Sequence, residues 1–196
     1  MHQPLPQSFF ERPTLHVAHD MLGARIIVRA NGIRKTLVIT EVEAYDGPKD
    51  KASHAYRGTT PRNALMFGDA GHWYIYLVYG MHWMLNITTG PERYPAAILI
   101  RSGITDAQQY LKGPGTLSRY LGIEGRWNGL LAAPRNNLWI ETTDINIPPR
   151  AIIKKPRIGV PYAKEWALKP YNFSVTPSLL SQYVVPDSIS SSRRVL

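Results

Sequence analysis

The stretch ARIIVRANGIRKTLVITEVEAY, residues 24–45, predicts two antiparallel strands joined by a tight turn. Both halves are rich in β-branched residues, and the Asn-Gly pair between them is a strong signal for a two-residue hairpin loop. Side chains alternate between the two faces of a strand, so Glu41, Glu43 and Tyr45 are expected on one face. Apolar residues earlier in the same strand share that face, and at least one carboxylate should therefore lie near buried surface.

The rest of the chain extends this β-rich pattern. Further strands are expected on both sides of Gly80 and at residues 96–102, 138–141, 151–155 and 171–175. Helical segments are expected at residues 14–22, 107–111, 115–123 and 162–168. Because strands outnumber helices and are linked mostly by hairpins, the expected fold class is mixed α/β (α+β). We expect a single domain around an antiparallel β-sheet, with a protruding β-hairpin and peripheral helices.

The composition predicts one domain with short ends. A chain of 196 residues, of which 44% are hydrophobic, is long enough to bury the core of one domain. We expect an N-terminal extension over residues 1–8, the domain itself over residues 9–174, and a loosely ordered, serine-rich tail over residues 175–196.

Several classes of protein are excluded by what the sequence lacks. It has no cysteine, which removes disulfides, iron–sulfur clusters and thiolate zinc sites and suits an intracellular protein. Its six histidines show no zinc-binding spacing with a carboxylate, so no metal is expected, and the sequence has no Walker loop and no GxGxxG motif for a nucleotide cofactor. No apolar run is long enough to span a membrane, and the N-terminus lacks the basic and apolar regions of a signal peptide. We therefore expect no membrane partner.

The charge of the chain indicates the kind of partner it binds. With a formal net charge of +9 and a pI near 9.9, we expect a polyanion, and nucleic acid before membrane. The alternative is that the charge serves solubility alone. Arginine and lysine are spread among aromatic and glycine residues, which favours a shaped groove over a flexible basic tail.

Two groups of residues are candidates for chemistry or binding. The pair Glu41 and Glu43 fits either a solvated strand edge or, on a partly buried face, a general base. The aromatic run HWYIYLVYGMHWMLN at residues 72–86 is explained for the most part by buried strands. Tyr79 is the exception, because it precedes Gly80 at the expected hairpin tip, where an aromatic ring is a candidate wedge between stacked bases.

Four motifs give the chain a specific resemblance. They are EVEAY.GP.D.ASH from Glu41, TPRN..MF from Thr60, Y.Y..YGM...LN from Tyr74 and R.G......W..KP from Arg157. Together they resemble the alkyladenine (3-methyladenine, methylpurine) DNA glycosylase family over about residues 9–174. One departure lies at Thr116, where this family commonly has a lysine.

The resemblance implies an enzyme of base excision repair. The family removes damaged purines such as 3-methyladenine, 7-methylguanine, hypoxanthine and ethenoadenine from duplex DNA, without a metal or other cofactor. The damaged base is flipped out of the duplex, and a water activated by a glutamate hydrolyses the N-glycosidic bond and leaves an abasic site. By this resemblance we expect a monofunctional, monomeric hydrolase without lyase activity. Its location would be the cytoplasm or nucleoid of a bacterium, or the nucleus of a eukaryote.

The resemblance also implies roles for individual residues. Glu43 would activate the attacking water, which Arg101 and the main-chain carbonyl of Ile158 would help to hold. The positions that would enclose the flipped base are Tyr45, His54, Tyr76 and Asn86. Tyr79 would fill the gap in the base stack, and the other DNA-binding positions would be Thr60, Arg62, Met66, Arg57 and Lys112.

Two other functions remain open on the sequence alone. A non-catalytic module that recognises flipped or single-stranded bases by stacking explains the charge and the aromatic residues, but not the carboxylate. A hydrolase of free nucleosides explains the carboxylate, but neither the net charge of +9 nor an exposed Tyr79.

Overall fold

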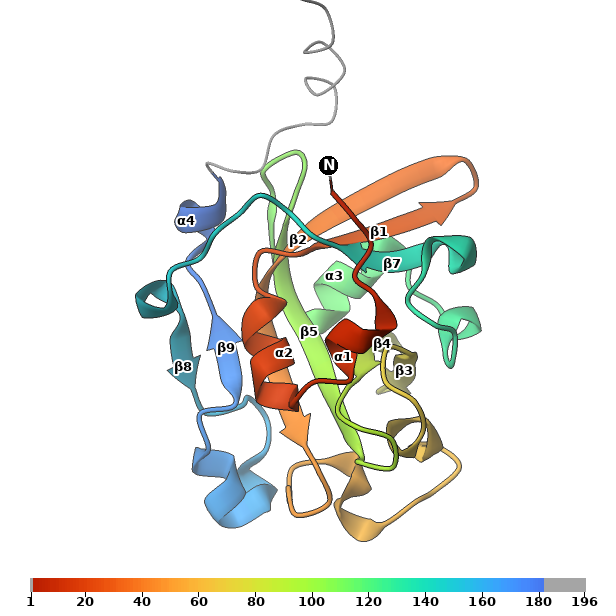
Figure 1. The fold of residues 1–196 in the computed structure, drawn as a ribbon, viewed down its shortest axis with the longest axis vertical. Coiled ribbons are helices and arrows are strands. Elements are labelled where there is room, and N and C mark those ends of the chain that lie inside the picture. The colour runs from red at the N-terminus through yellow and green to blue at the C-terminus, as the bar shows by residue number, and fades with distance from the viewer. Residues whose placement is uncertain (1, 182–196) are drawn as a thin grey trace, which may run out of the picture.

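An antiparallel sheet forms the body of the protein in the computed structural model, which describes residues 2–181 (Figure 1). Its strands run in the order β3-β4-β5-β2-β1-β7, while β6 pairs with β5, β9 with β2 and β8 with β9. The strands are β1 (Arg25–Ala30), β2 (Ile33–Asp46), β3 (Trp73–Val78), β4 (His82–Thr88), β5 (Ala96–Thr105), β6 (Tyr110–Lys112), β7 (Leu138–Glu141), β8 (Ile153–Lys155) and β9 (Asn172–Ser174). The expected fold class, a single α+β domain around an antiparallel sheet, is confirmed.

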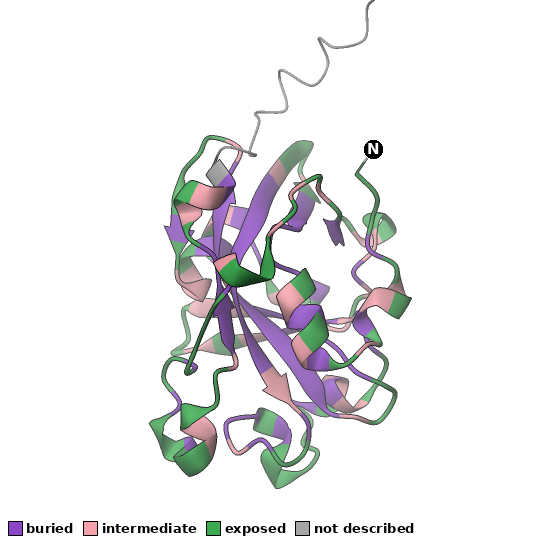
Figure 2. Ribbon diagram, turned by 60° about the vertical axis from the view of Figure 1, so that its left-hand side comes forward, coloured by how far each residue is buried: buried purple, intermediate pink, exposed green. Residues whose placement is uncertain are grey.

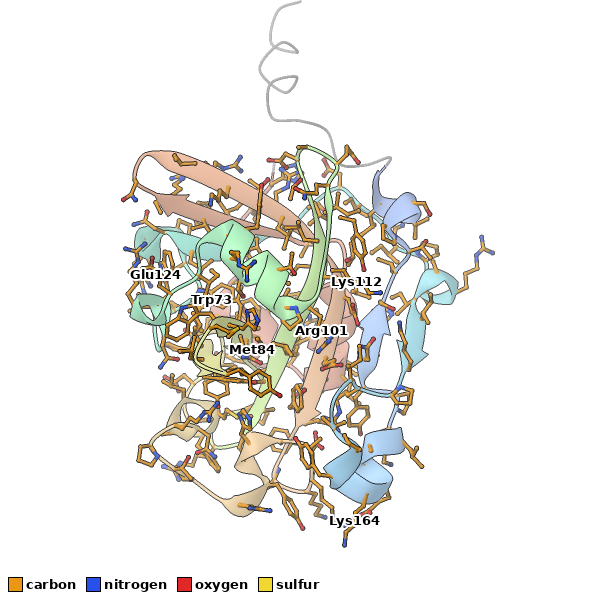
Figure 3. All side chains as sticks on the ribbon, turned by 180° about the vertical axis from the view of Figure 1, so that it is seen from behind. Trp73, Met84, Arg101, Lys112, Glu124 and Lys164 are labelled. Carbon is orange, nitrogen blue, oxygen red and sulfur yellow. The ribbon has the colours of Figure 1, made fainter. Side chains whose placement is uncertain are left out.

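Helices cover both faces of this sheet. In Figure 1, α2 lies in front of β2 and β5, and α3 lies behind them; Figure 3 shows α3 from that side. The α-helices are α1 (Gln7–Phe10), α2 (Thr14–Asp20), α3 (Pro114–Leu121) and α4 (Pro177–Ser181). The 3-10 helices are η1 (His54–Arg57), η2 (Ala64–Phe67), η3 (Gly125–Trp127), η4 (Pro134–Asn136), η5 (Pro149–Ala151) and η6 (Pro161–Leu168). None of these helices is long and apolar enough to cross a membrane.

The long strand β2 lies in the interior of the sheet. It forms a hairpin with β1, as the opening stretch of sequence predicts. It pairs with β1 across a turn in which Asn31 and Gly32 both have positive φ, at 51° and 73°. Only a turn of this mirror-image kind matches the twist of the two strands, which explains the Asn-Gly pair. On its other edge β2 pairs with β5, whereas β9 continues the edge of β1 and pairs with residues 41–43 near the end of β2. The ladder with β5 shifts register on either side of Glu41.

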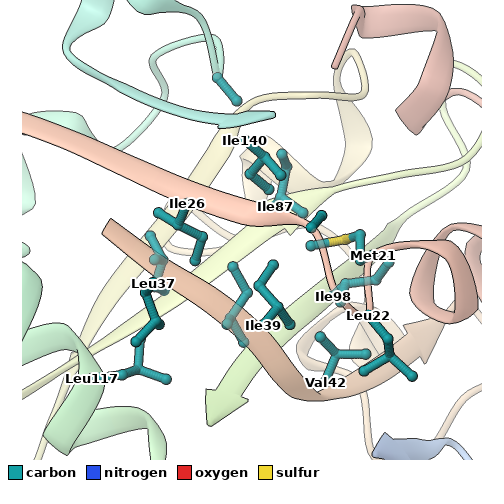
Figure 4. Close-up of a cluster of buried hydrophobic side chains, with 14 of the residues drawn as sticks. Met21, Leu22, Ile26, Leu37, Ile39, Val42, Ile87, Ile98, Leu117 and Ile140 are labelled. Carbon is teal, nitrogen blue, oxygen red and sulfur yellow. The ribbon is translucent and has the colours of Figure 1, made fainter. Parts of the chain in front are cut away.

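The main hydrophobic core lies between the sheet and its helices. Figure 4 shows Met21 and Leu22 at the end of α2, Ile39 and Val42 from β2, and Leu117 from α3 among these buried side chains. Figure 2 shows that the strands are mostly buried, whereas the helices keep one exposed face. Full burial of an aliphatic side chain of this size contributes roughly 1.5–3 kcal/mol, so this cluster fixes how β2 and β5 lie between α2 and α3.

The β3–β4 hairpin turns where the sequence predicts. Val78 pairs with His82, and the tip between them contains Tyr79 with φ of 52° and Gly80 with φ of 67°. A positive φ is strained for a tyrosine but not for a glycine. The hairpin therefore holds a strained and 88% exposed aromatic side chain at its tip.

One predicted helix is wrong. The segment 107–111 was expected to be helical, but Tyr110–Lys112 forms β6 and pairs with β5 through Ser102, Gly103 and Ile104. Hydrogen bonds to a neighbouring strand outweigh the weak local helix propensity of these residues.

The C-terminal part of the described chain packs against the domain. Val175 and Leu180 are buried, and α4 contacts β5. Residues 182–196, which make up most of the predicted tail, lie outside the described residues. The predicted boundaries at residues 8 and 174 stay predictions.

Candidate active site

A cavity of about 220 Å³ lies where β2, β3, β4 and β5 meet the start of α3 and the segment 158–162. This volume suits a small ring system, since pockets for drug-sized ligands measure roughly 300–1,000 Å³. In Figure 3, Arg101 lies near the centre of this face, with Met84 beside it. The predicted site residues that line the cavity are Tyr45, His54, Met66, Tyr76, Asn86, Arg101 and Ile158.

Glu43 lies just behind the wall of this cavity and is 0% exposed. Its Oε2 accepts hydrogen bonds from the Tyr45 hydroxyl and from Nη1 of Arg101, each at 3.1 Å. Its Oε1 accepts one from the Ile158 main-chain N–H at 2.7 Å and one from Nδ2 of Asn172 at 3.1 Å. The Ile158 contact seen here is its N–H donating to Glu43; the predicted role of its carbonyl, which is to hold the attacking water, stays a prediction. Four donors hold this carboxylate in one orientation, toward the residues that line the cavity.

Tyr45 links Glu43 to the cavity. Burial, and next the negative charge of Glu43, raise the pKa of Tyr45 well above its ordinary value of 10. The hydroxyl therefore stays protonated at neutral pH and donates to Glu43. A ligand or water that displaces this hydroxyl gains direct access to the carboxylate.

His54 and Tyr76 form an aromatic part of the wall. Their rings pack edge to face with centroids 4.9 Å apart, and Nδ1 of His54 lies 2.9 Å from the Tyr74 hydroxyl. Burial, and next the charge of Arg62, lower the pKa of His54 below its ordinary value of 6.5. The imidazole is therefore neutral at pH 7. Burial also raises the pKa of Tyr76 to about 12, so its phenol is neutral as well.

Asn86 contributes a fixed amide to the cavity and is 2% exposed. Its Nδ2 donates to the main-chain carbonyls of Tyr74 at 3.0 Å and Met84 at 3.2 Å. The amide is thus anchored to its own hairpin, and its position relative to a ring in the cavity is set by the β3–β4 pairing.

The predicted DNA-binding residues are mostly exposed. Thr60, Arg57 and Lys112 lie at the surface, and Arg62 stacks on the Tyr76 ring at 4.9 Å from its centroid. Met66 does not lie on this surface: it is 2% exposed and lines the cavity beside Tyr74 and Tyr76.

The structure adds a buried ion pair that the sequence did not reveal. Asp50 and Arg157 are fully buried and joined by two hydrogen bonds, one of them 2.8 Å between Nη2 and Oδ1. Arg157 also donates to the Ala44 carbonyl at 2.8 Å and lies over the Tyr45 ring at 4.9 Å from its centroid. Because Arg157 directly precedes Ile158, this pair fixes both the Tyr45 ring and the N–H that binds Glu43. The only sequence signal was that both residues belong to the quoted motifs.

Within residues 2–181, no group of three or more His, Asp or Glu side chains could hold a metal ion. The ionisable groups around the cavity are instead the Glu43 carboxylate, the Arg101 guanidinium, the neutral His54 imidazole and four tyrosine phenols.

Comparisons with known proteins agree with one another. The family model described as methylpurine-DNA glycosylase matches residues 8–178. A protein of Anaeromyxobacter dehalogenans (strain 2CP-1 / ATCC BAA-258) is 40% identical over 89% of this chain and 83% of its own length. A protein of Methanocella arvoryzae is 40% identical over 86% of this chain and 90% of its own, and one of Legionella pneumophila (strain Corby) is 43% identical over 83% and 89%. Each carries the name "Putative 3-methyladenine DNA glycosylase".

Proposed function

The chain belongs to the methylpurine-DNA glycosylase family, and from this we propose that it excises damaged purines from duplex DNA. The proposed lesions are 3-methyladenine, 7-methylguanine, hypoxanthine and ethenoadenine. The observation that carries the proposal is the fully buried Glu43, held by Arg101 and by the Ile158 N–H at the wall of an aromatic cavity.

Base flipping is the first step that we propose. A base inside a duplex cannot reach a cavity of about 220 Å³, so the nucleotide must rotate out at a free-energy cost of a few kcal/mol. Tyr45, His54 and Tyr76 would enclose it, and electron-rich rings attract cationic alkylated purines. The exposed ring of Tyr79 would occupy the gap in the stack.

Hydrolysis is the second step. The glycosidic bond of a nucleoside breaks with oxocarbenium character at the sugar, as it does in glycoside hydrolysis. Glu43 would take a proton from water while its negative charge stabilises the positive sugar, and Arg101 would hold the carboxylate and the water in place.

The reaction should stop at the abasic site. A lyase needs an amine nucleophile, and among the described residues no lysine lines the cavity. We therefore propose a monofunctional enzyme that acts as a monomer. Borohydride should trap no covalent protein–DNA adduct, and a trapped adduct would overturn this part of the proposal.

One assay separates the proposed function from the alternatives. A duplex with a single hypoxanthine is incubated with the protein and then treated with alkali. Strand cleavage only after alkali is expected for a monofunctional glycosylase. A stacking module without catalysis leaves the strand intact, and a nucleoside hydrolase releases base from free inosine but not from the duplex. The same assay over a panel of lesions gives the substrate preference.

We propose that the protein acts on the nucleoid in the cytoplasm, because its matching relatives come from bacteria and archaea.

A further inference from the structure

Glu41 is a buried carboxylate next to the proposed base, and the hydrolysis proposed above does not involve it. Its Oε2 accepts a hydrogen bond from the Ser102 hydroxyl at 2.7 Å, and its Oε1 accepts one from Nδ2 of Asn172 at 2.8 Å. The same Asn172 nitrogen lies 3.1 Å from Oε1 of Glu43. One fully buried amide therefore joins the two carboxylates.

Arg101 lies between these two carboxylates. Its Nη1 is 3.1 Å from Oε2 of Glu43, and its Nε is 3.5 Å from Oε1 of Glu41. The Nε–H makes no hydrogen bond, so its contact with Glu41 is ionic. Counted as ionised, two carboxylates and one guanidinium give the cluster a net charge of −1, because Asn172 and Ser102 are neutral.

This charge balance matters for a cationic transition state. A guanidinium paired with Glu43 alone would cancel its charge and leave a neutral site facing a positive sugar. With Glu41 on the other side of Arg101, one negative charge remains uncompensated. In a site shielded from water, one unit charge several ångströms away acts strongly, because fixed charges there are screened less than in solution.

We propose that Glu41 is a positioning residue that acts through Arg101: it compensates the guanidinium, so that the charge of Glu43 stays available to a cationic sugar. The inference rests on the proposed function and assigns a role to the second carboxylate of the strand. It also predicts how the site responds when each charge is removed.

The test measures charge recognition without requiring turnover. Two duplexes are compared, one with a cationic pyrrolidine abasic analogue and one with a neutral tetrahydrofuran abasic analogue. The quantity measured is the preference, defined as the ratio of the Kd for the neutral duplex to the Kd for the cationic one. The variants are Glu41→Gln, Arg101→Gln and the double variant, with cluster charges of 0, −2 and −1.

The expected order follows these charges. Glu41→Gln should lower the preference at least ~10-fold by weakening only the cationic complex, the scale of one charge at an effective dielectric constant near ~20. The double variant should return to the wild-type preference, and Arg101→Gln should lie at or above it. This recovery is a coupling that a double-mutant cycle detects and that independent effects do not produce.

Two control variants separate charge from packing. Ser102→Ala removes a hydrogen bond to Glu41 but keeps its charge, and it should retain the wild-type preference. Glu141→Gln neutralises another buried strand carboxylate, which accepts from Trp139 and does not line the cavity, and it should also be unchanged.

An unchanged preference in Glu41→Gln overturns the inference, as does a double variant as weak as Glu41→Gln, or a Ser102→Ala variant that loses the preference. If Glu41→Gln does not fold, agreement between the double variant and the wild type decides the question, because both have the same cluster charge of −1. The hypoxanthine assay with wild-type protein distinguishes failure of the proposed function from failure of the inference about Glu41. Absence of release overturns the proposed function and this inference with it, whereas release with an unchanged preference overturns the inference alone.

Discussion

At the scale of single residues, the proposed chemistry depends on one carboxylate that accepts four hydrogen bonds. Tyr45, Arg101, Ile158 and Asn172 all donate to Glu43. Their arrangement keeps both oxygens oriented, and three of the four donors, Tyr45, Arg101 and Ile158, also line the cavity.

Replacing Glu43 with glutamine should abolish chemistry and spare DNA binding. The amide keeps the shape of the side chain but cannot accept a proton, so single-turnover excision of hypoxanthine should fall by at least ~100-fold. Affinity for the same duplex should change little. Glu141→Gln is the matched control; Glu41→Gln is unsuitable because Glu41 shares Arg101 and Asn172 with Glu43. Comparable excision by the Glu43→Gln protein would rule out this residue as the base.

Acidification should act on cationic lesions more than on neutral ones. The pKa of His54 is lowered from 6.5, so the ring is neutral at pH 7 and gains a proton only below pH 6.5. A charged imidazole repels a cationic purine in the cavity. The ratio of 7-methylguanine to hypoxanthine excision should therefore fall between pH 7 and pH 5. In His54→Gln this ratio should be flat across the same range, and an equal fall in that variant would assign the effect to another group.

At the scale of elements, sequence and structure agree best where the pattern is local. The β1–β2 and β3–β4 hairpins are confirmed because alternating residues and turn residues lie within a few positions of each other. The segment 107–111 was predicted wrongly because its partner strand, β5, decides its conformation. The ion pair of Asp50 and Arg157 was missed for the same kind of reason, since 107 positions separate its members and only the folded chain brings them together.

Replacing Tyr79 at the tip of the β3–β4 hairpin should affect excision more than it affects the stability of the protein. Tyr79 has φ of 52°, which a glycine adopts without strain. Tyr79→Gly should leave the free energy of unfolding unchanged or raise it by up to ~1 kcal/mol, while excision falls because the wedge is absent. Tyr79→Ala removes the ring but keeps the strain and serves as the control. A clear loss of stability in Tyr79→Gly, measured by denaturant unfolding, would show that the ring packs structurally.

The buried pair Asp50–Arg157 should be one of the costliest contacts to break. Both side chains are 0% exposed, so Asp50→Asn leaves an uncompensated buried guanidinium and should lower the free energy of unfolding by about 3–5 kcal/mol. The neighbouring pair Lys51 and Glu165 lies at the surface, and Glu165→Gln should change little in the same denaturant titration. Equal effects of the two substitutions would contradict the structural role assigned to Arg157.

At the scale of the whole molecule, a chain of net charge +9 forms the candidate cavity partly from the β3–β4 hairpin, and the tip of this hairpin is exposed. The net charge follows directly from the composition. The position of Tyr79 at a hairpin tip could be predicted because it depends on one local turn. The sequence did not predict that Glu43 lies behind the cavity wall, because that depends on how β2, β5, β9 and the segment around Ile158 pack together.

DNA binding should be salt-dependent in a way that separates backbone contacts from the wedge. Each phosphate contact releases counterions, so log K should fall linearly with log salt, with a slope of about −0.9 per contact. Lys112→Ala and Arg57→Ala should each make the slope shallower by about 0.9 if the side chain contacts a phosphate. Tyr79→Ala should leave the slope unchanged while lowering excision, because an uncharged ring releases no ions. A changed slope in Tyr79→Ala with normal excision would remove Tyr79 from the wedge role, and an unchanged slope in both basic variants would locate the DNA-binding surface elsewhere on the molecule.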